Sequence, residues 1–347
     1  MPGEAAKNRV VASLTVTPYR PRYHIAEGDP FDDIVTDLDI WTIRGPRGDR
    51  RELAVLAESG QEYRLNSRGG IMDKIETVRH SVIAGTWYPG TEGQLRKTVR
   101  GYLDNVEKEK LEGELIGLIS PHAGYIYSGQ VAAHAYKQLD GVYYDAVAVI
   151  SPVHRMFVGR FAVTSATAYE TPLGLVKVDA ELVEATDKEI GLSRVSQDNE
   201  HSLEIQLPFL QVVLGEFKLL PIMVGDQEMS LCQKLGTALA KVLKGRNALL
   251  VASTDLSHFH NYGTAVRLDE IVLERVRAYD PEGLAQDLKR GKCEACGGGP
   301  VVAVMLAAKE MGANKAKVLK YMNSGDVTGD RFQVVGYMAA ALYRAGT

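Results

Sequence analysis

The sequence predicts an α/β fold, in which a largely parallel sheet is sandwiched by helices and a small extension precedes it at the N-terminus. Two observations support this fold class. From about residue 72 onward, short and almost continuously apolar segments alternate with amphipathic helical segments, a pattern typical of parallel strands buried on both faces. Hydrophobic residues make up 45% of the 347 residues and charged residues 24%, which is enough apolar material for a large core.

The N-terminal region differs from the rest of the chain in its positive charges. Residues 1–71 hold nine Arg and one Lys, whereas residues 72–347 hold thirteen Arg and seventeen Lys. This shift predicts an N-terminal extension over residues 1–71 and an α/β domain over residues 72–347. Met72 is a second candidate for the natural start of the protein.

Within the extension, β-type alternation predicts strands at Val10–Val16 and Asp39–Arg44. Turn residues follow at positions 45–48, and residues 67–70 have the composition of a linker. We therefore expect a small β-rich module that carries no chemical motif.

Composition excludes several classes of partner. The formal net charge of −4 gives no reason to expect binding to nucleic acid or to an anionic membrane. No apolar run approaches the roughly 20 residues that span a bilayer, and the N-terminus lacks the features of a signal peptide. Three cysteines are an odd number and do not suggest a disulfide framework. These observations predict a cytoplasmic protein.

The α/β domain can be divided into elements from its apolar pattern. Amphipathic spacing predicts helices at Glu92–Lys110, Gly129–Leu139, Ala180–Ile190, Leu231–Leu243, Leu268–Tyr279 and Pro300–Met311. Continuous apolar runs predict strands at Leu115–Ser120, Ala146–Ser151, Leu219–Val224 and Leu249–Ser253.

Three of these strands are followed closely by a histidine. His122, His154 and His258 come just after the first, second and fourth strands. Ligands of open α/β sheets bind beyond the carboxyl ends of the strands, and imidazole is a common ligand for iron, zinc, copper and nickel. The alternative is that each histidine bonds only the local backbone, but three at equivalent positions favour a shared metal site.

Asp255 lies three residues before His258, where an apolar strand ends. A carboxylate beside an imidazole can fix its tautomer and raise its basicity, as in a general acid/base pair. The alternative is that Asp255 only caps the next turn or helix.

A second polar cluster includes Glu200 and His201 and precedes a helix-like stretch at Leu203–Leu214. Ser202 is a candidate N-cap for this helix, although Pro208 would kink or restart it. From spacing alone, a functional cluster and a simple capping cluster are equally consistent with these residues.

Cys293 and Cys296 form a single CxxC, which is weak support for structural zinc. Cys296 directly precedes a glycine-rich helix start, so a depressed pKa and a role as thiolate ligand or nucleophile are expected. Cys232 lies within an amphipathic helix and is expected in the core.

Six separated runs resemble, in their order, the Memo family, whose prokaryotic members are called AmmeMemoRadiSam system protein B. The runs are AGTWYPG, SPHAGYIYSGQVAAHAYKQL, SPVH, DNEHSLEIQLPFL, STDLSHF and CGGGP. The resemblance covers about residues 78–343 and leaves out the extension.

The resemblance implies a fold like that of class III extradiol dioxygenases, which hold non-haem Fe(II) with two His and one carboxylate. It implies metal ligands at His122 and His154, with Cys296 in place of the carboxylate. It also implies an acid/base role for His258 with Asp255 beside it, and places His201 in the same site. A thiolate ligand favours Cu(I) or a non-catalytic role for iron.

The leading hypothesis is therefore an iron- or copper-dependent redox protein that acts on a small molecule. The alternative is a metal-binding or adaptor protein that retains the fold without catalysis. A metal-assisted hydrolase also fits the His/Asp set, but no phosphate- or acyl-binding element accompanies it. The family name further implies association with a radical-SAM protein and a small companion protein.

Overall fold

The computed structural model describes residues 39–44, 51–56, 62–65, 71–74 and 77–346. The chain divides into two compact units, residues 1–76 and 77–347. The strand expected at Val10–Val16, the turn at 45–48 and the linker at 67–70 lie outside the described residues. In the part described, no helix is long and apolar enough to cross a membrane.

The N-terminal unit contains a four-stranded antiparallel sheet in the order β1-β2-β3-β4. Its strands are β1 (Asp39–Arg44), β2 (Arg51–Leu56), β3 (Glu62–Leu65) and β4 (Ile71–Lys74). β1 coincides with a predicted strand. β4 includes Met72, where the sequence places the start of the main domain, so the pairing of this unit continues past that residue to Lys74.

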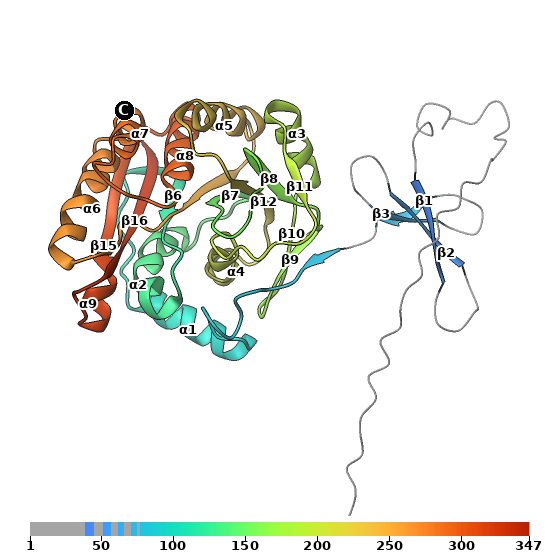
Figure 1. Ribbon diagram of the computed structural model, residues 1–347, viewed down its shortest axis with the longest axis horizontal. Coiled ribbons are helices and arrows are strands. Elements are labelled where there is room, and N and C mark those ends of the chain that lie inside the picture. The colour runs from blue at the N-terminus through green and yellow to red at the C-terminus, as the bar shows by residue number, and fades with distance from the viewer. Residues whose placement is uncertain (1–38, 45–50, 57–61, 66–70, 75–76, 347) are drawn as a thin grey trace, which may run out of the picture. The chain divides into compact units, whose positions relative to one another are not determined.

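The second unit is built on a nine-stranded sheet in the order β11-β8-β12-β7-β13-β6-β16-β14, with β15 paired to β16 (Figure 1). The strands are β6 (Gly113–Ser120), β7 (Ala146–Pro152), β8 (Phe161–Thr164), β11 (Ser193–Val195), β12 (Lys218–Val224), β13 (Ala248–Ser253), β14 (His258–His260), β15 (Lys315–Asn323) and β16 (Val334–Ala345). Four central strands, β12, β7, β13 and β6, are parallel neighbours. They are the four strands predicted from the sequence, and the α/β fold class is confirmed.

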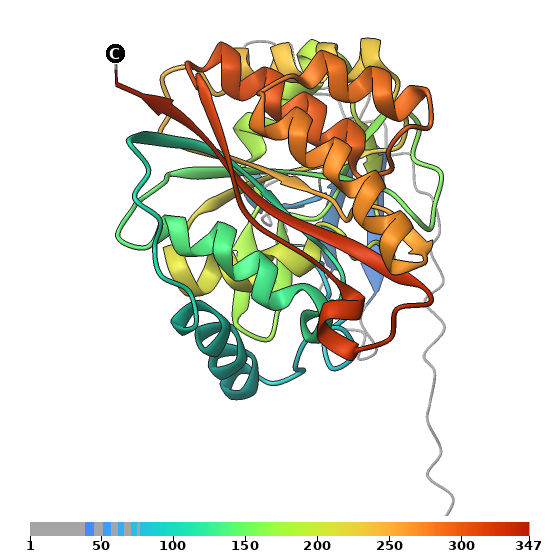
Figure 2. The same cartoon turned by 90° about the vertical axis from the view of Figure 1, so that its left-hand side faces the viewer.

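Helices cover both faces of the sheet (Figure 2). They are α1 (Glu92–Asp104), α2 (Tyr125–Tyr136), α3 (Ala180–Ile190), α4 (Leu207–Leu214), α5 (Met229–Val242), α6 (Tyr262–Arg277), α7 (Pro281–Lys289), α8 (Gly298–Glu310) and α9 (Ser324–Thr328). The side chains of β7 alternate between two cores. Val147 and Val149 pack with residues of α1, α2 and α4, whereas Ala148 and Ile150 pack with residues of α3, α5 and α8. This two-sided burial is why the strand is apolar from Ala146 to Ile150.

The C-terminal strands were not predicted. Together with β8, which pairs antiparallel with β12, they make the sheet mixed. β16 pairs antiparallel with β6 on one side and with β15 on the other. The buried run Ala339–Ala341 in β16 consists of alanines, which have little preference for strands. Strand formation here depends on pairing with β6, which a local pattern does not reveal.

Several helix boundaries also differ from expectation. α1 ends at Asp104, six residues before Lys110, and Asn105 is its C-cap. α2 begins at Tyr125 rather than Gly129. α6 begins at Tyr262, where the Asn261 side chain accepts a hydrogen bond from the Thr264 backbone N–H, so a polar cap starts the helix before its apolar stripe.

A smaller sheet, in the order β10-β9-β5, joins the start of this unit to its interior. Its strands are β5 (Val78–Arg79), β9 (Ala168–Thr171) and β10 (Gly174–Lys177). Arg79 Nη2 donates to Asp198 Oδ1 at 2.7 Å and to the Glu200 carbonyl at 2.6 Å. Arg79 also pairs with the fully buried Glu204, which accepts a hydrogen bond from the Tyr88 hydroxyl at 2.6 Å. Arg79 thus fixes the loop over residues 198–204.

Candidate metal centre

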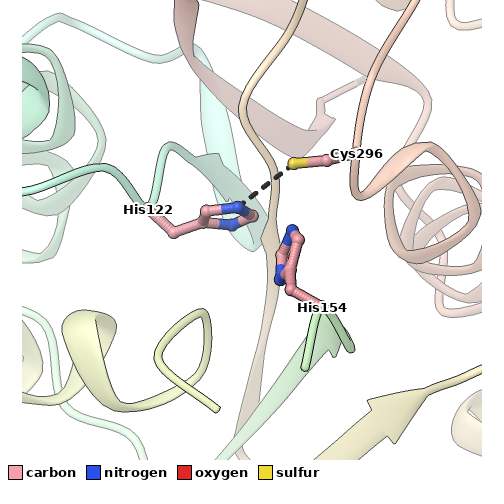
Figure 3. Close-up of side chains that lie close together, drawn as sticks. All are labelled: His122, His154 and Cys296. Carbon is pink, nitrogen blue, oxygen red and sulfur yellow. Dashed lines mark hydrogen bonds between the residues drawn. The ribbon is translucent and has the colours of Figure 1, made fainter. Parts of the chain in front are cut away.

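Three side chains from separate loops meet at the carboxyl ends of the central strands (Figure 3). His122 follows β6, His154 follows β7, and Cys296 lies two residues before α8. One donor atom from each lies within 4.8 Å of the other two, and His122 Nε2 lies 3.1 Å from Cys296 Sγ. The structure therefore brings together the three residues for which the sequence predicts metal ligation.

These donors suit a transition-metal ion. Metal–nitrogen bonds of about 2.0–2.1 Å and metal–sulfur bonds of about 2.3 Å place donors roughly 3.3–3.8 Å apart in a tetrahedral site. The separations of 3.1 Å and at most 4.8 Å bracket this range. Two imidazoles and a thiol are borderline-to-soft ligands, which suit iron, copper or zinc better than magnesium or calcium.

His122 is 2% exposed and is held from two sides. Its backbone N–H donates to Asp255 Oδ1 at 2.7 Å, and its Nδ1 lies 2.9 Å from Ser253 Oγ. Burial lowers the pKa of His122 well below the usual value, and the neighbouring histidines lower it further. A neutral imidazole is the form that binds a metal.

His154 is positioned by Glu200, which is almost fully buried. The Glu200 carboxylate accepts hydrogen bonds from three successive backbone N–H groups, those of His154, Arg155 and Met156, at 2.6–3.2 Å. Such charge-assisted bonds are short and strong. They hold the loop after β7, so Glu200 fixes the backbone from which the His154 ring projects.

His154, Glu200 and His201 also form a group with ligand-type spacing. Because the Glu200 oxygens already accept backbone hydrogen bonds, this carboxylate serves as an anchor for the loop.

Ser202 is not the N-cap expected for the following helix. Its hydroxyl donates to the Pro152 carbonyl at 2.6 Å, and α4 starts later, with Pro208 in its first turn, where a missing N–H costs little.

Cys296 is placed by a close approach of its loop to β13. The Cys296 backbone N–H donates to the Asp255 carbonyl at 3.2 Å, and the Asp255 backbone N–H points to Cys296 Sγ at 3.3 Å. A Cβ atom at Gly297 would lie 2.2 Å from the Ser253 carbonyl oxygen, so only glycine permits this contact. The glycine after Cys296 is therefore a requirement of the site's geometry.

The expected low pKa of Cys296 is wrong for the metal-free protein. Burial raises the pKa of the thiol, and the charge of Asp255 raises it further. These two effects outweigh the nearby helix N-terminus. Cys293 lies in the hydrophobic core and is outside the ligand group, and Cys232 is buried in the core as expected.

Asp255 is 4% exposed and faces the centre. Its Oδ2 lies 3.9 Å from His122 Nε2. Burial raises the pKa of Asp255 to about 7, although the backbone N–H groups of His122 and Ala123 partly oppose this increase. Asp255 therefore anchors the loop after β6 instead of capping a helix, and it can change its charge near neutral pH.

His258 and His201 lie close enough to His122 for their charges to lower its pKa. His258 Nδ1 donates to the Leu256 carbonyl at 2.7 Å, which leaves Nε2 with a lone pair. The His201 ring lies 4.8 Å from the His154 ring and 4.3 Å from Trp87, centroid to centroid. Burial lowers the pKa of His201 to about 3, and its Nδ1 has no hydrogen-bond partner among the residues described.

The sequence did not identify Ser253 and Gln206 as part of this centre. Ser253 ends β13 and contacts His122, and Gln206 Nε2 donates to Ser253 Oγ at 2.8 Å. A small polar residue at the buried end of a strand could have indicated Ser253. No local signal indicates Gln206.

Comparison with known proteins agrees with these features. Residues 79–341 match the family described as "Memo-like protein". A MEMO1 family protein of Nitrosopumilus maritimus is 38% identical over 272 residues, covering 76% of this chain and 98% of that protein. MEMO1 family proteins of Methanosarcina mazei and Thermotoga neapolitana are 36% and 35% identical over 270 and 283 residues; each alignment covers 76% of this chain, and 98% and 99% of those proteins.

The match begins at Arg79, ends within β16 and includes the candidate metal centre. The resemblance noted in the six sequence motifs is confirmed over three quarters of the chain and nearly the whole length of these relatives. This chain belongs to the Memo family.

Proposed function

We propose that this protein binds one transition-metal ion, Fe(II) or alternatively copper, through His122, His154 and Cys296, and that it is a redox protein acting on a small molecule. The observation that carries the proposal is the convergence of two imidazoles and one thiol within 4.8 Å at the carboxyl ends of parallel strands. This edge is where α/β proteins bind their ligands.

A bound iron or copper ion would supply one-electron chemistry and coordination positions for an exogenous ligand. The residues of the chain would perform the remaining tasks. His258 presents Nε2 with a lone pair and can accept or donate a proton. Asp255 can hold a proton near neutral pH, because its pKa is raised to about 7. His201 stays neutral at that pH and adds no positive charge beside the ion.

The first test is metal content of anaerobically purified protein, measured by mass spectrometry. Wild-type protein is expected to carry iron or copper in near-stoichiometric amount, or to take up Fe(II) or Cu(I) on anaerobic loading. His122→Ala and Cys296→Ala are expected to lose it. Cys293→Ala is the matched control, because Cys293 belongs to the same CxxC but lies in the core. Wild-type protein that binds neither ion would contradict the proposal.

A second candidate is a metal-binding or adaptor protein without catalysis, favoured by a thiol in place of a ligand carboxylate. His258→Ala separates the two candidates. If the site is catalytic, this variant keeps its metal and loses oxygen uptake in a screen with catechols. If metal-loaded wild-type protein consumes no oxygen with any compound tested, the non-catalytic candidate is favoured.

A further inference from the structure

We infer that Ser253 and Gln206 are positioning residues that hold His122 as the tautomer protonated at Nδ1, so that the Nε2 lone pair points at Cys296. The hydrogen bonds around Ser253 carry this inference. Its consequence for metal affinity rests on the proposed function, whereas the tautomer itself can be tested on metal-free protein.

The Ser253 hydroxyl has a single proton to donate. Ser253 Oγ lies 2.6 Å from the Ser202 carbonyl oxygen. A carbonyl can only accept a hydrogen bond, so this contact requires the hydroxyl proton to point at Ser202. Ser253 then has only lone pairs to offer its other partners. His122 Nδ1, at 2.9 Å from Ser253 Oγ, must therefore carry a proton and donate it.

The orientation of the Gln206 amide is set by its three hydrogen-bond contacts. Gln206 Nε2 donates to the Pro121 carbonyl at 3.0 Å and to Ser253 Oγ at 2.8 Å. Gln206 Oε1 accepts from the Tyr136 hydroxyl at 2.7 Å. A flipped amide would place its oxygen against the Pro121 carbonyl, which has no proton to give. The amide is thus fixed, and it occupies the second lone pair of Ser253.

The other tautomer of His122 would break the hydrogen bond between Ser253 and Ser202. Protonation at Nε2 would need the Ser253 proton to turn toward His122, which would leave the Ser253 and Ser202 oxygens 2.6 Å apart without a proton between them. Ser253 and Ser202 are fully buried, so water cannot replace that bond. A buried acceptor without a partner costs about 1–3 kcal/mol, enough to select one tautomer.

The consequence lies at the opposite ring nitrogen. With the proton on Nδ1, Nε2 is the bare nitrogen, and it lies 3.1 Å from Cys296 Sγ. His122 is then already in its metal-binding form before an ion arrives. Loss of such an outer hydrogen bond typically lowers metal affinity about 10–100-fold.

The test begins with metal-free wild-type protein labelled with ¹⁵N-histidine. Protonated and bare ring nitrogens have clearly different ¹⁵N shifts, and the His122 signals are assigned by their loss in His122→Gln. We expect a neutral ring with the proton on Nδ1. A His122 ring protonated at Nε2 would overturn the inference without any variant having to fold.

Two variants then compare the loss of the hydrogen-bonded Ser253 hydroxyl with the loss of the Ser151 hydroxyl. Ser253→Ala is expected to lose the single-tautomer spectrum and to bind Fe(II) about 10–100-fold more weakly. Ser151→Ala is the control. It removes a buried hydroxyl near the end of the neighbouring β7 that has no hydrogen-bond partner in the part of the chain that the structure describes, so both readouts should be unchanged. Wild-type tautomer and affinity in Ser253→Ala would overturn the positioning role. If wild-type protein has the Nδ1 proton but binds no ion, the inference stands and the proposed function fails.

Discussion

His122 Nε2 lies 3.1 Å from Cys296 Sγ although 174 positions separate the two residues in the chain. The two side chains approach from opposite directions, one from the loop after β6 and the other from the loop before α8 (Figure 3). Both loops bond to Asp255, whose carboxylate accepts the His122 N–H and whose backbone carbonyl accepts the Cys296 N–H. One residue, two positions after the end of β13, therefore sets the separation between the two donors.

Replacing Gly297 tests the placement of Cys296. In Gly297→Ala the new Cβ would lie 2.2 Å from the Ser253 carbonyl oxygen and 2.8 Å from Thr254 Cβ, so the loop must shift. We expect a loss of stability of about 1–3 kcal/mol by denaturant unfolding and a loss of metal. Gly101→Ala is the control, because a Cβ there meets no atom of the described residues within 4 Å. It should stabilise α1 by about 0.5–1 kcal/mol, and equal behaviour of the two variants would contradict the argument.

Replacing Glu200 tests the anchor of the His154 loop. Glu200→Gln replaces the carboxylate that accepts hydrogen bonds from three backbone N–H groups. The variant loses the negative charge and places an amide NH₂ against one of these N–H groups. A loss of about 1–3 kcal/mol in the free energy of unfolding is expected, together with weaker metal binding. The control is Glu170→Gln, whose exposed pair with His80 should contribute less than about 1 kcal/mol. A stable Glu200→Gln protein with full metal affinity would show that the loop needs no such anchor.

The pH dependence of metal affinity should reflect the loss of one proton, that of the Cys296 thiol. The raised pKa of Cys296 means that its thiol proton must leave when a metal binds. The lowered pKa values of His122 and His154 mean that these rings are already neutral and need not release a proton. Affinity should therefore increase with pH. Between pH 8 and 9, where Asp255 is already ionised, we expect about a tenfold gain per pH unit, measured by chelator competition with Fe(II). Cys296→Ala should lose this slope along with most of its affinity, and a flat profile for the wild type would exclude thiolate binding.

Asp255 should make the metal-free protein less stable as the pH rises from 3.8 to about 7. Its folded pKa of about 7 lies above the ordinary value of 3.8, so the folded state binds more protons between these values and stability falls as pH rises through this window. Asp255→Asn keeps an acceptor for the His122 N–H and removes the charge. The variant should become more stable than the wild type by an amount that grows from pH 5 to pH 8, on the order of 1–4 kcal/mol. Thermal unfolding of both proteins across this range measures the difference, and a constant difference would contradict the raised pKa.

The sequence predicted the four central strands because burial on both faces leaves a continuous apolar run. It also predicted that His122 and His154 lie near each other, since a polar residue just after such a run lies at the ligand-binding edge of the sheet. The placement of Cys296 was supported mainly by the family resemblance. Its physical basis, the close approach of Gly297 to β13, depends on the packing of α8 and is not visible in local sequence.

The hydrogen-bond partners of the centre were harder to predict. For the polar cluster that includes Glu200, spacing alone left a functional role and a capping role equally open. The hydrogen bonds that Glu200 accepts from the loop after β7 are tertiary contacts across about 45 positions. Gln206 bonds to Ser253 and Pro121, which are distant in the chain. The thiol pKa was predicted in the wrong direction, because the helix N-terminus was considered without the burial and the Asp255 charge that oppose it.

The position of Arg79 sets a limit on how this chain can be shortened or fused to other proteins. A protein that begins at Thr77 keeps the guanidinium that neutralises Asp198 and Glu204. A protein that begins at Ser81 leaves two buried carboxylates without their counter-charge, a loss that typically costs about 3–5 kcal/mol for one buried pair. An exchange of the N-terminal extension should therefore join before Thr77, because four residues further on the cut would release the loop that carries Glu200 and His201.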